Sequence, residues 1–310
     1  MHATQTMQLG EPVEHRGIVV TPLFPRRDPV AQYLTLDAAL ARGLRIEETS
    51  AAGSVPELRV VNPLEDRVLL YDGEELVGAK QNRILNVTVL VEATSTLPIP
   101  VSCVEEGRWR TLSADFRSAG HISHAELRHR KAESLVTEPL ARGIAQQDVW
   151  DAVREKAARM QVASPTGANA DTFRAHRGRI EQLEGAFPAQ AGQCGAVLAL
   201  GDTLCLDWVS RPDAFVELWP KLRTGYLLDA LERLDSEPTS GTSVTAFVDA
   251  VAAADATRHS SAGLGEDVRL RGERIVGSGL ELEGEPLQLS AFTAGRGSRG
   301  GRIARPSRRM

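Results

Sequence analysis

Cysteine is scarce in this chain of 310 residues. Three cysteines occur, Cys103, Cys194 and Cys205, and no two of them form a CxxC pair. An odd number without that spacing predicts neither a disulfide framework nor a zinc knuckle. The N-terminal residues also lack a charged segment followed by an apolar one, so no secretory signal is indicated. Together these absences predict a cytoplasmic location.

Long apolar runs are absent as well. No stretch of about 18 apolar residues occurs, which argues against a membrane-spanning helix and predicts no membrane partner. The chain is nevertheless 42% hydrophobic and 25% charged. These values are ordinary for a globular protein that buries a core. The length allows one large domain or two small ones.

Positive charge is concentrated at one end of the chain. Residues 294–310 hold six arginines and no acidic residue, so the other 293 residues carry 30 basic against 41 acidic side chains. The tail has almost nothing to bury and is expected to be disordered. It is either a solubilising end or a weak nucleic-acid-binding segment that acts through counterion release. The acidic body argues against DNA binding as the main function.

The pattern of apolar residues changes along the chain. Residues 16–112 contain short alternating segments separated by turn residues, a pattern typical of a sandwich or a partly closed barrel. Residues 113–293 mix helical periodicity with closing strands. The sequence therefore predicts one α+β domain over 16–293, preceded by a flexible lead-in over 1–15.

Individual elements follow from the same patterns. Asp72-Gly73 predicts a hairpin between strands 67–71 and 74–78, because this pair tolerates positive φ. Residues 83–91 alternate and predict a single longer strand. Further strands are expected at 17–24, 44–48, 58–62, 99–104, 108–112, 197–200, 203–207, 268–270, 274–276, 280–282 and 287–289, and helices at 34–43, 122–131, 144–160, 169–183, 212–219, 221–234 and 243–254.

The densest group of polar side chains lies between Gly73 and Asn86. Positive charges among amide side chains suit a ligand that carries phosphate and hydroxyl groups. The alternative is a hairpin and crossover whose polar side chains face water, with Glu75 a simple ion-pair partner of Lys80. The candidates from this segment are Glu75 as general acid or base, and Lys80, Gln81, Asn82, Arg83 and Asn86 as ligand-binding residues.

A second polar group follows at residues 100–109. Glu105 is a candidate general acid or base, and Arg108 either grips a phosphate or pairs with Glu105. Trp109 either stacks on a base such as adenine or anchors a hairpin to the core. Cys103 stands on a predicted strand among apolar residues, which favours an inert core thiol.

Two histidines invite a metal hypothesis. His121 and His124 are expected to share one face of a helix, but no carboxylate stands at a familiar ligand spacing, and HExxH is absent. The sequence therefore favours solvated or capping histidines over a metal site. Residues 164–171 are interpreted as the start of a helix. The P-loop, GxGxxG and GxSxG signatures are also missing.

Three segments carry a family resemblance: GEELVGAKQNRILN, PVSCVEEGRW and SPTGANADTF. Over about residues 17–292 the chain resembles the ARG and rhodanese-phosphatase-superfamily-associated protein family, in which ARG stands for ADP-ribosylglycohydrolase. The resemblance implies a link to NAD or ADP-ribose metabolism. It implies no particular active site, so the candidate roles above come from the residues themselves.

The function expected from the sequence is binding or processing of an ADP-ribose-like, NAD-related or other nucleotide-like ligand. The sequence leaves open whether the protein is an enzyme and which cofactor it uses. The alternative is a non-enzymatic interaction module, in which the polar cluster supports the sheet and the Arg/Gly tail binds RNA or a protein partner.

Overall fold

The computed structural model describes residues 3–29, 31–50, 53–54, 56–137, 144–234 and 243–294. Almost all of the predicted Arg/Gly tail lies outside these residues. The strands are β1 (Met7–Leu9), β2 (Val13–His15), β3 (Ile18–Pro25), β4 (Leu34–Thr35), β5 (Arg45–Glu48), β6 (Glu57–Asn62), β7 (Val68–Leu70), β8 (Glu74–Gly78), β9 (Arg83–Leu85), β10 (Val89–Val91), β11 (Ser95–Cys103), β12 (Phe116–Ile122), β13 (Gly195–Leu200), β14 (Thr203–Val209), β15 (Asp255–Ser260), β16 (Glu266–Arg271), β17 (Ile275–Leu282) and β18 (Glu285–Thr293). The helices are the 3-10 turn η1 (Ala3–Thr6) and α1 (Leu36–Ala41), α2 (Ala125–Thr137), α3 (Gln146–Arg159), α4 (Asn169–Glu184), α5 (Pro212–Ala230) and α6 (Val244–Ala253). The fold is α+β.

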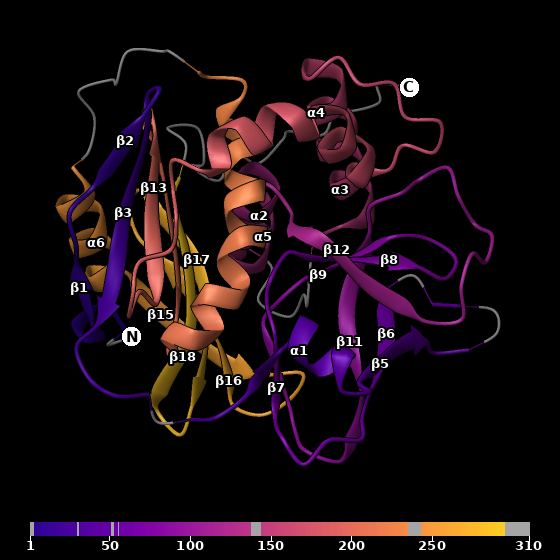
Figure 1. Ribbon diagram of the computed structural model, residues 1–310. Coiled ribbons are helices and arrows are strands. Elements are labelled where there is room, and N and C mark those ends of the chain that lie inside the picture. The colour runs from indigo at the N-terminus through magenta and orange to yellow at the C-terminus, as the bar shows by residue number, and fades with distance from the viewer. Residues whose placement is uncertain are drawn as a thin grey trace, which may run out of the picture.

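A large antiparallel sheet forms one side of the molecule. Its strand order is β1-β3-β13-β14-β18-β17-β16-β15, and β2 also pairs with β3. Alternate residues of these strands face opposite sides, so the sheet buries two apolar faces. One face packs on α6 through Phe247 and Val251, and the other packs on α5 through Phe215 and Leu222. Figure 1 shows α5 and α2 between this sheet and the second β region.

The second β region is a curled half-barrel with strand order β12-β8-β9-β11-β6-β5. A bridge between Glu47 and Asp115 brings β5 close to the start of β12, so the two edges of the curled sheet approach each other. Its interior is filled by aliphatic side chains, including Ile46, Leu76 and Val101. A three-stranded sheet, β10-β7-β4, packs beside it. The sequence left a sandwich and a barrel open, and the half-barrel corresponds to the second.

Charged side chains are buried where the two β regions meet. Asp207 on β14 accepts hydrogen bonds from Arg128 on α2, at 2.8 Å to Oδ2 and 2.5 Å to Oδ1. The same carboxylate accepts bonds from Tyr71, Tyr226 and Ser290. Five hydrogen bonds from four residues, which are far apart in the sequence, therefore converge on one carboxylate, which is fully buried. Such a network stabilises a single arrangement of the elements, because a buried charge without its partner is costly.

Several element predictions are confirmed. The strand pair predicted around residues 201–202 is β13–β14, and the pair predicted around 283–286 is β17–β18, in which Leu280 lies opposite Gln288. The helices predicted at 144–160, 169–183 and 243–254 are α3, α4 and α6. No helix in the described part of the chain is long and apolar enough to cross a membrane.

The predicted hairpin at Asp72-Gly73 is wrong. β7 pairs with β4 and β10, whereas β8 pairs with β9 and β12, so the turn connects two different sheets. The single strand predicted over 83–91 is also divided, because β9 belongs to the half-barrel and β10 to the three-stranded sheet. Residues 108–112 form no strand. Local alternation cannot tell which sheet a strand joins, and here that choice is made by distant partners.

Two further predictions are corrected. Residues 7–9 and 13–15, assigned to a flexible lead-in, form β1 and β2 and pair with β3. The two helices predicted on either side of Pro220 are one helix, α5. Pro220 has no backbone N–H, so the carbonyl oxygen of Val216, four residues earlier, loses its hydrogen bond within the helix. The side chain of Val216 is half exposed, so this turn lies where water can satisfy the carbonyl.

Gly225 allows α5 to approach the half-barrel closely. A Cβ atom at this position would lie 2.5 Å from the carbonyl oxygen of Ile122 on β12. Gly225→Ala is therefore expected to lower the free energy of unfolding by about 1–3 kcal/mol, although alanine favours helix. Gly178→Ala is the matched control, because Gly178 is also inside a helix and has no atom within 4 Å of the added Cβ. It is expected to raise stability by up to about 1 kcal/mol. Urea denaturation of both variants tests this, and equal effects would contradict the packing argument.

Candidate functional site

The acidic residues at the turn into β8 are buried and point to different elements. Asp72 forms an ion pair with Lys131 on α2, and Glu74 forms one with Lys221 on α5. Burial raises the pKa of the Glu74 carboxyl, and Lys221 opposes that rise. Burial lowers the pKa of Lys131, and Asp72 opposes that change. These two acids therefore join the β8 turn to two helices.

Glu75, the next residue on β8, lies on the opposite face of the strand and is fully buried. Its Oε2 lies 2.9 Å from Nε2 of His121 and accepts a 2.7 Å hydrogen bond from Nδ2 of Asn169. Asn82 approaches its Oε1 at 3.5 Å. The His121 ring is stacked on Phe173, with 3.8 Å between ring centroids. The partner of Glu75 is thus His121 on β12, rather than the Lys80 considered from the sequence.

An open cleft of about 610 Å³ lies beside this group. Asn82, His121 and Phe173 line it, so the imidazole that Glu75 holds faces the cleft. The Nε2 atom of His121 is bonded to Glu75, which leaves Nδ1 as the ring nitrogen available to a ligand. The remaining lining residues are Val77, Arg117, Ser118, Ala119, Gly120, Ala170, Arg174, Arg177, Ile180, Glu181, Glu184 and Thr224.

Three arginines line the cleft, but two of them already have acidic partners. Arg174 pairs with Asp171, and Arg177 pairs with Glu181. Arg117, on β12, makes no ion pair within the described part of the chain. Its guanidinium is therefore the cationic group in the cleft that has no compensating carboxylate, and a guanidinium binds phosphate or carboxylate groups well.

The predicted candidates Glu105 and Arg108 form a second cluster that shares Asn82 with the first. Arg108 forms a 2.6 Å ion pair with Glu105 and also donates to Oδ1 of Asn82 and to the carbonyl oxygen of Ala79. The other oxygen of Glu105 accepts a hydrogen bond from Thr166. These contacts hold residues 79–82 in place. The catalytic role of Glu105 and the ligand role of Arg108 stay predictions.

Lys80, Arg83 and Trp109 lie together at one end of the half-barrel. Lys80 Nζ and Arg83 Cζ are 5.5 and 5.7 Å from the centre of the Trp109 ring, within the range of cation–π contacts. Arg83 also donates to the side chain of Gln81 and lies 3.9 Å from Glu48. Trp109 is half exposed, so it does not anchor a hairpin to the core, which was the alternative considered from the sequence.

Asn86 and Cys103 belong to neither the Glu75–His121 group nor the Glu105–Arg108 group. Asn86 accepts a hydrogen bond from Ser102, and the ligand role predicted for it stays a prediction. The backbone of Cys103 is bonded to the side chain of Gln146 on α3. Burial raises the pKa of the Cys103 thiol to about 11, so it stays protonated near neutral pH. This agrees with the inert core thiol that the sequence favours.

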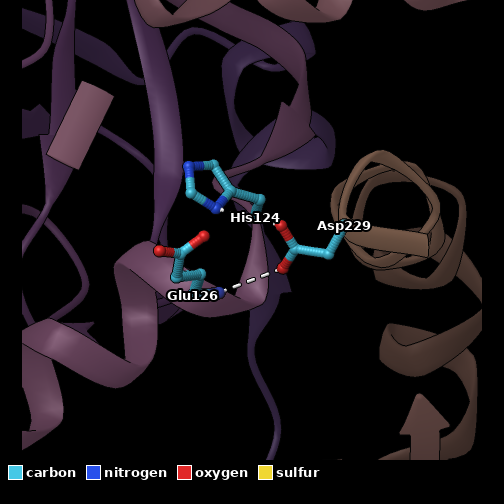
Figure 2. Close-up of side chains that lie close together, drawn as sticks. All are labelled: His124, Glu126 and Asp229. Carbon is cyan, nitrogen blue, oxygen red and sulfur yellow. Dashed lines mark hydrogen bonds and ion pairs between the residues drawn. The ribbon is translucent and has the colours of Figure 1, made fainter. Parts of the chain in front are cut away.

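A cluster of possible metal ligands lies where α2 begins, opposite α5. Figure 2 shows His124, Glu126 and Asp229, whose ligand atoms lie within 4.8 Å of one another. Lys156 donates to Asp229 at 2.7 Å, and Arg159 pairs with Glu126. Cationic side chains thus already compensate both carboxylates. The cluster is interpreted as an ion-pair network that connects α2, α3 and α5.

The histidine prediction needs two corrections. His121 belongs to β12, so it shares no helix face with His124, and both side chains are buried rather than solvated. His124 does cap a helix, because its Nδ1 accepts from the backbone N–H of Leu127 at 3.4 Å.

Sequence reasoning missed His121, Asn169 and Phe173 as parts of one site. Asn169 and Phe173 lie on α4, where the segment after Ser164 indicated only a helix start. Their spacing of four residues was the available signal, because it puts both on one face of a helix.

Comparison with known proteins adds a family to this geometry. A family model described as the ARG and Rhodanese-Phosphatase-superfamily-associated Protein domain matches residues 6–292. The matched stretch contains every site residue described above. No curated protein and no solved structure matches the chain.

Proposed function

The chain belongs to the ARG and rhodanese-phosphatase-superfamily-associated protein family, and from this premise we propose that its cleft binds a phosphate-bearing, nucleotide-like ligand of the ADP-ribose or NAD type. The observation that carries the proposal is the meeting of the Glu75–His121 pair with Arg117 at one open cleft. A volume of about 610 Å³ is within the usual range for small-molecule sites.

The charges of the cleft support an anionic ligand. Arg117 has no acidic partner in the described part of the chain, and Arg174 and Arg177 stand on α4 at the same cleft. Phosphate oxygens accept two parallel hydrogen bonds from a guanidinium, which makes arginine well suited to this task. The His121 and Phe173 rings add flat apolar surface beside the polar groups.

The Glu75–His121 pair supports proton transfer to or from a bound ligand. A carboxylate that accepts from one ring nitrogen of histidine sets the tautomer and the orientation of the ring. The other nitrogen is then the atom that exchanges a proton. In this proposal His121 is the acid–base group, whereas Glu75 orients it and Asn169 holds Glu75. Glu75 thus acts through His121 instead of contacting the ligand directly.

Calorimetric titration with ADP-ribose, NAD and AMP tests the binding proposal. At least one of them is expected to bind saturably, and a ligand at 100 times its Kd should stabilise the fold by about 2.7 kcal/mol in thermal denaturation. Arg117→Ala is expected to weaken binding about tenfold or more, because it removes a charge-assisted hydrogen bond.

Arg179→Ala is the matched control, since Arg179 is exposed on α4 but does not line the cleft. It should leave the Kd unchanged. Failure of all three ligands to bind at millimolar concentration would overturn the proposal. Equal affinity of the Arg117 variant and the unmodified protein would remove Arg117 from the site.

A further inference from the structure

The end of the half-barrel beneath Trp109 contains a buried polar pair that the cleft does not use. Arg83 lies directly opposite Leu76 on β8 and Cys103 on β11, so its side chain shares their face of the sheet. Leu76 belongs to the half-barrel core, and Glu48 follows the core residue Ile46 by two positions on β5. Arg83 and Glu48 therefore point inward at the same end of the half-barrel.

Arg83 is fully buried, yet two of its three guanidinium nitrogens have no hydrogen-bond partner. The Nη1 atom donates to Gln81 at 3.0 Å. Nε and Nη2 make no hydrogen bond within the part of the chain that the structure describes, and Nη2 is 3.9 Å from Oε1 of Glu48. The Oε2 atom of Glu48 is buried without a partner as well. Buried polar atoms are nearly always paired, so this place is prepared for a group that supplies the missing partners.

The unpaired atoms stand in a definite order. Nε and Nη2 form one edge of the planar guanidinium, the two-donor fork that binds two adjacent acceptors. Next to that fork lies a carboxylate oxygen, which requires a donor. A simple anion would satisfy the fork, but it would leave Oε2 of Glu48 without a hydrogen-bond partner and would be repelled by that carboxylate. The complementary ligand therefore presents two acceptors followed by a donor along one edge.

We infer that this end of the half-barrel is a second binding site, which recognises a guanine base through Arg83 and Glu48 and stacks it on Trp109. Along one side guanine carries the N7 and O6 acceptors, the pair that arginine binds in a bidentate manner. Its N1–H donor follows O6 and is available to a carboxylate. Adenine presents an amino donor where guanine has O6, so it cannot satisfy the fork.

Trp109 controls access to this site. Its ring lies over Arg83, and half of the residue is exposed, on a stretch without helix or strand. The preceding residue, Arg108, is fixed by its ion pair with Glu105. In this proposal the indole moves aside to admit the base and then covers it. Stacking on an aromatic ring adds binding energy for any base. The discrimination between bases therefore comes from Arg83 and Glu48.

Titration of the full-length protein with guanosine, followed by tryptophan fluorescence and by calorimetry, tests the inference. Guanosine is expected to bind about tenfold or more tightly than adenosine, and 7-deazaguanosine, which lacks the N7 acceptor, should bind about tenfold less tightly than guanosine. Inosine keeps N7, O6 and N1–H and should bind like guanosine. These ligand comparisons require no variant, so they stay decisive even if a change at the buried Arg83 impairs folding.

Variants separate this site from the cleft. Glu48→Gln and Trp109→Leu are expected to weaken guanosine binding about tenfold or more, whereas Arg117→Ala should not change it. Equal affinity for guanosine and adenosine, or no binding of guanosine at millimolar concentration, would overturn the inference. Loss of guanosine binding in the Arg117 variant but not in the Glu48 variant would overturn it too, since the nucleoside would then occupy the cleft. The inference does not rest on the proposed function, and either can fail alone.

Discussion

Asp207→Asn is expected to lower the free energy of unfolding by about 3–5 kcal/mol at neutral pH. The substitution keeps the size of the side chain but leaves the buried Arg128 guanidinium without its main counter-charge. Tyr71, Tyr226 and Ser290 would also lose the charged acceptor that they share. Urea denaturation followed by circular dichroism measures the effect.

The dependence of this effect on pH follows from the pKa of Asp207. Burial alone would raise that pKa, but Arg128 and the hydrogen bonds from Ser290 and Tyr226 hold it below its usual value. A carboxyl whose folded-state pKa is depressed contributes stability above its unfolded pKa, near 4, and loses it as the pH falls through the folded value. The difference between the unmodified protein and the variant should therefore be largest near neutral pH and should shrink below about pH 4.

Asp151→Asn is the control for a general effect of removing a negative charge. Asp151 pairs with Arg154 on the surface of α3, where both side chains are well exposed. Exposed pairs contribute little, so no measurable change in the denaturation midpoint is expected. If Asp207→Asn were equally harmless, the buried network would not be what holds α2 against the large sheet.

If the proposed function holds, His121→Asn is expected to reduce turnover of an ADP-ribose-type ligand about 10²–10⁴-fold, because it removes the proposed acid–base group. The Kd of the ligand should change much less, since Arg117 and the rest of the cleft remain. Glu75→Gln should also lower turnover, since the amide no longer fixes the histidine tautomer through a charged acceptor. Chromatographic separation of the products from ADP-ribose and NAD measures turnover, and calorimetry measures the Kd.

The control for His121 is His176→Asn. His176 lies on α4 and bonds to the carbonyl oxygen of Met160, and it is not among the residues that line the cleft. Its replacement should leave both quantities unchanged. Tight binding without any turnover in the unmodified protein would identify a binding protein and would refute the acid–base role of His121.

Much of the architecture could be predicted from local sequence pattern. The α+β class, the β-rich first half and three of the helices follow from apolar periodicity, because that periodicity is a property of neighbouring residues. The hairpin at Asp72-Gly73 and the strand over 83–91 could not be predicted correctly. Both depend on which distant strand supplies the hydrogen bonds, and the same local sequence fits either choice.

The candidate site residues were also predicted only in part from the sequence. Composition singled out the polar stretch from Glu75 to Asn86 and the Glu105–Trp109 segment, since charged and amide side chains stand out among apolar strands. These residues are close in the sequence, but alternation along the strands sends neighbouring side chains to different places. Asn82 lines the cleft and Glu75 holds His121 at it, whereas Arg83 points into the half-barrel beneath Trp109.

The sequence by itself determined where chemistry is concentrated, how the charge is distributed and which elements form. Only the tertiary structure decided which side chains contact one another. Glu75 meets His121 and Asn169 because β8, β12 and the start of α4 converge, over sequence separations of 46 and 94 residues. No local pattern encodes such contacts, since they arise when the whole chain buries its apolar faces at once. For the same reason the close spacing of His121 and His124 in the sequence does not form a metal site. His121 lies on β12 and is held by the buried carboxylate of Glu75 instead.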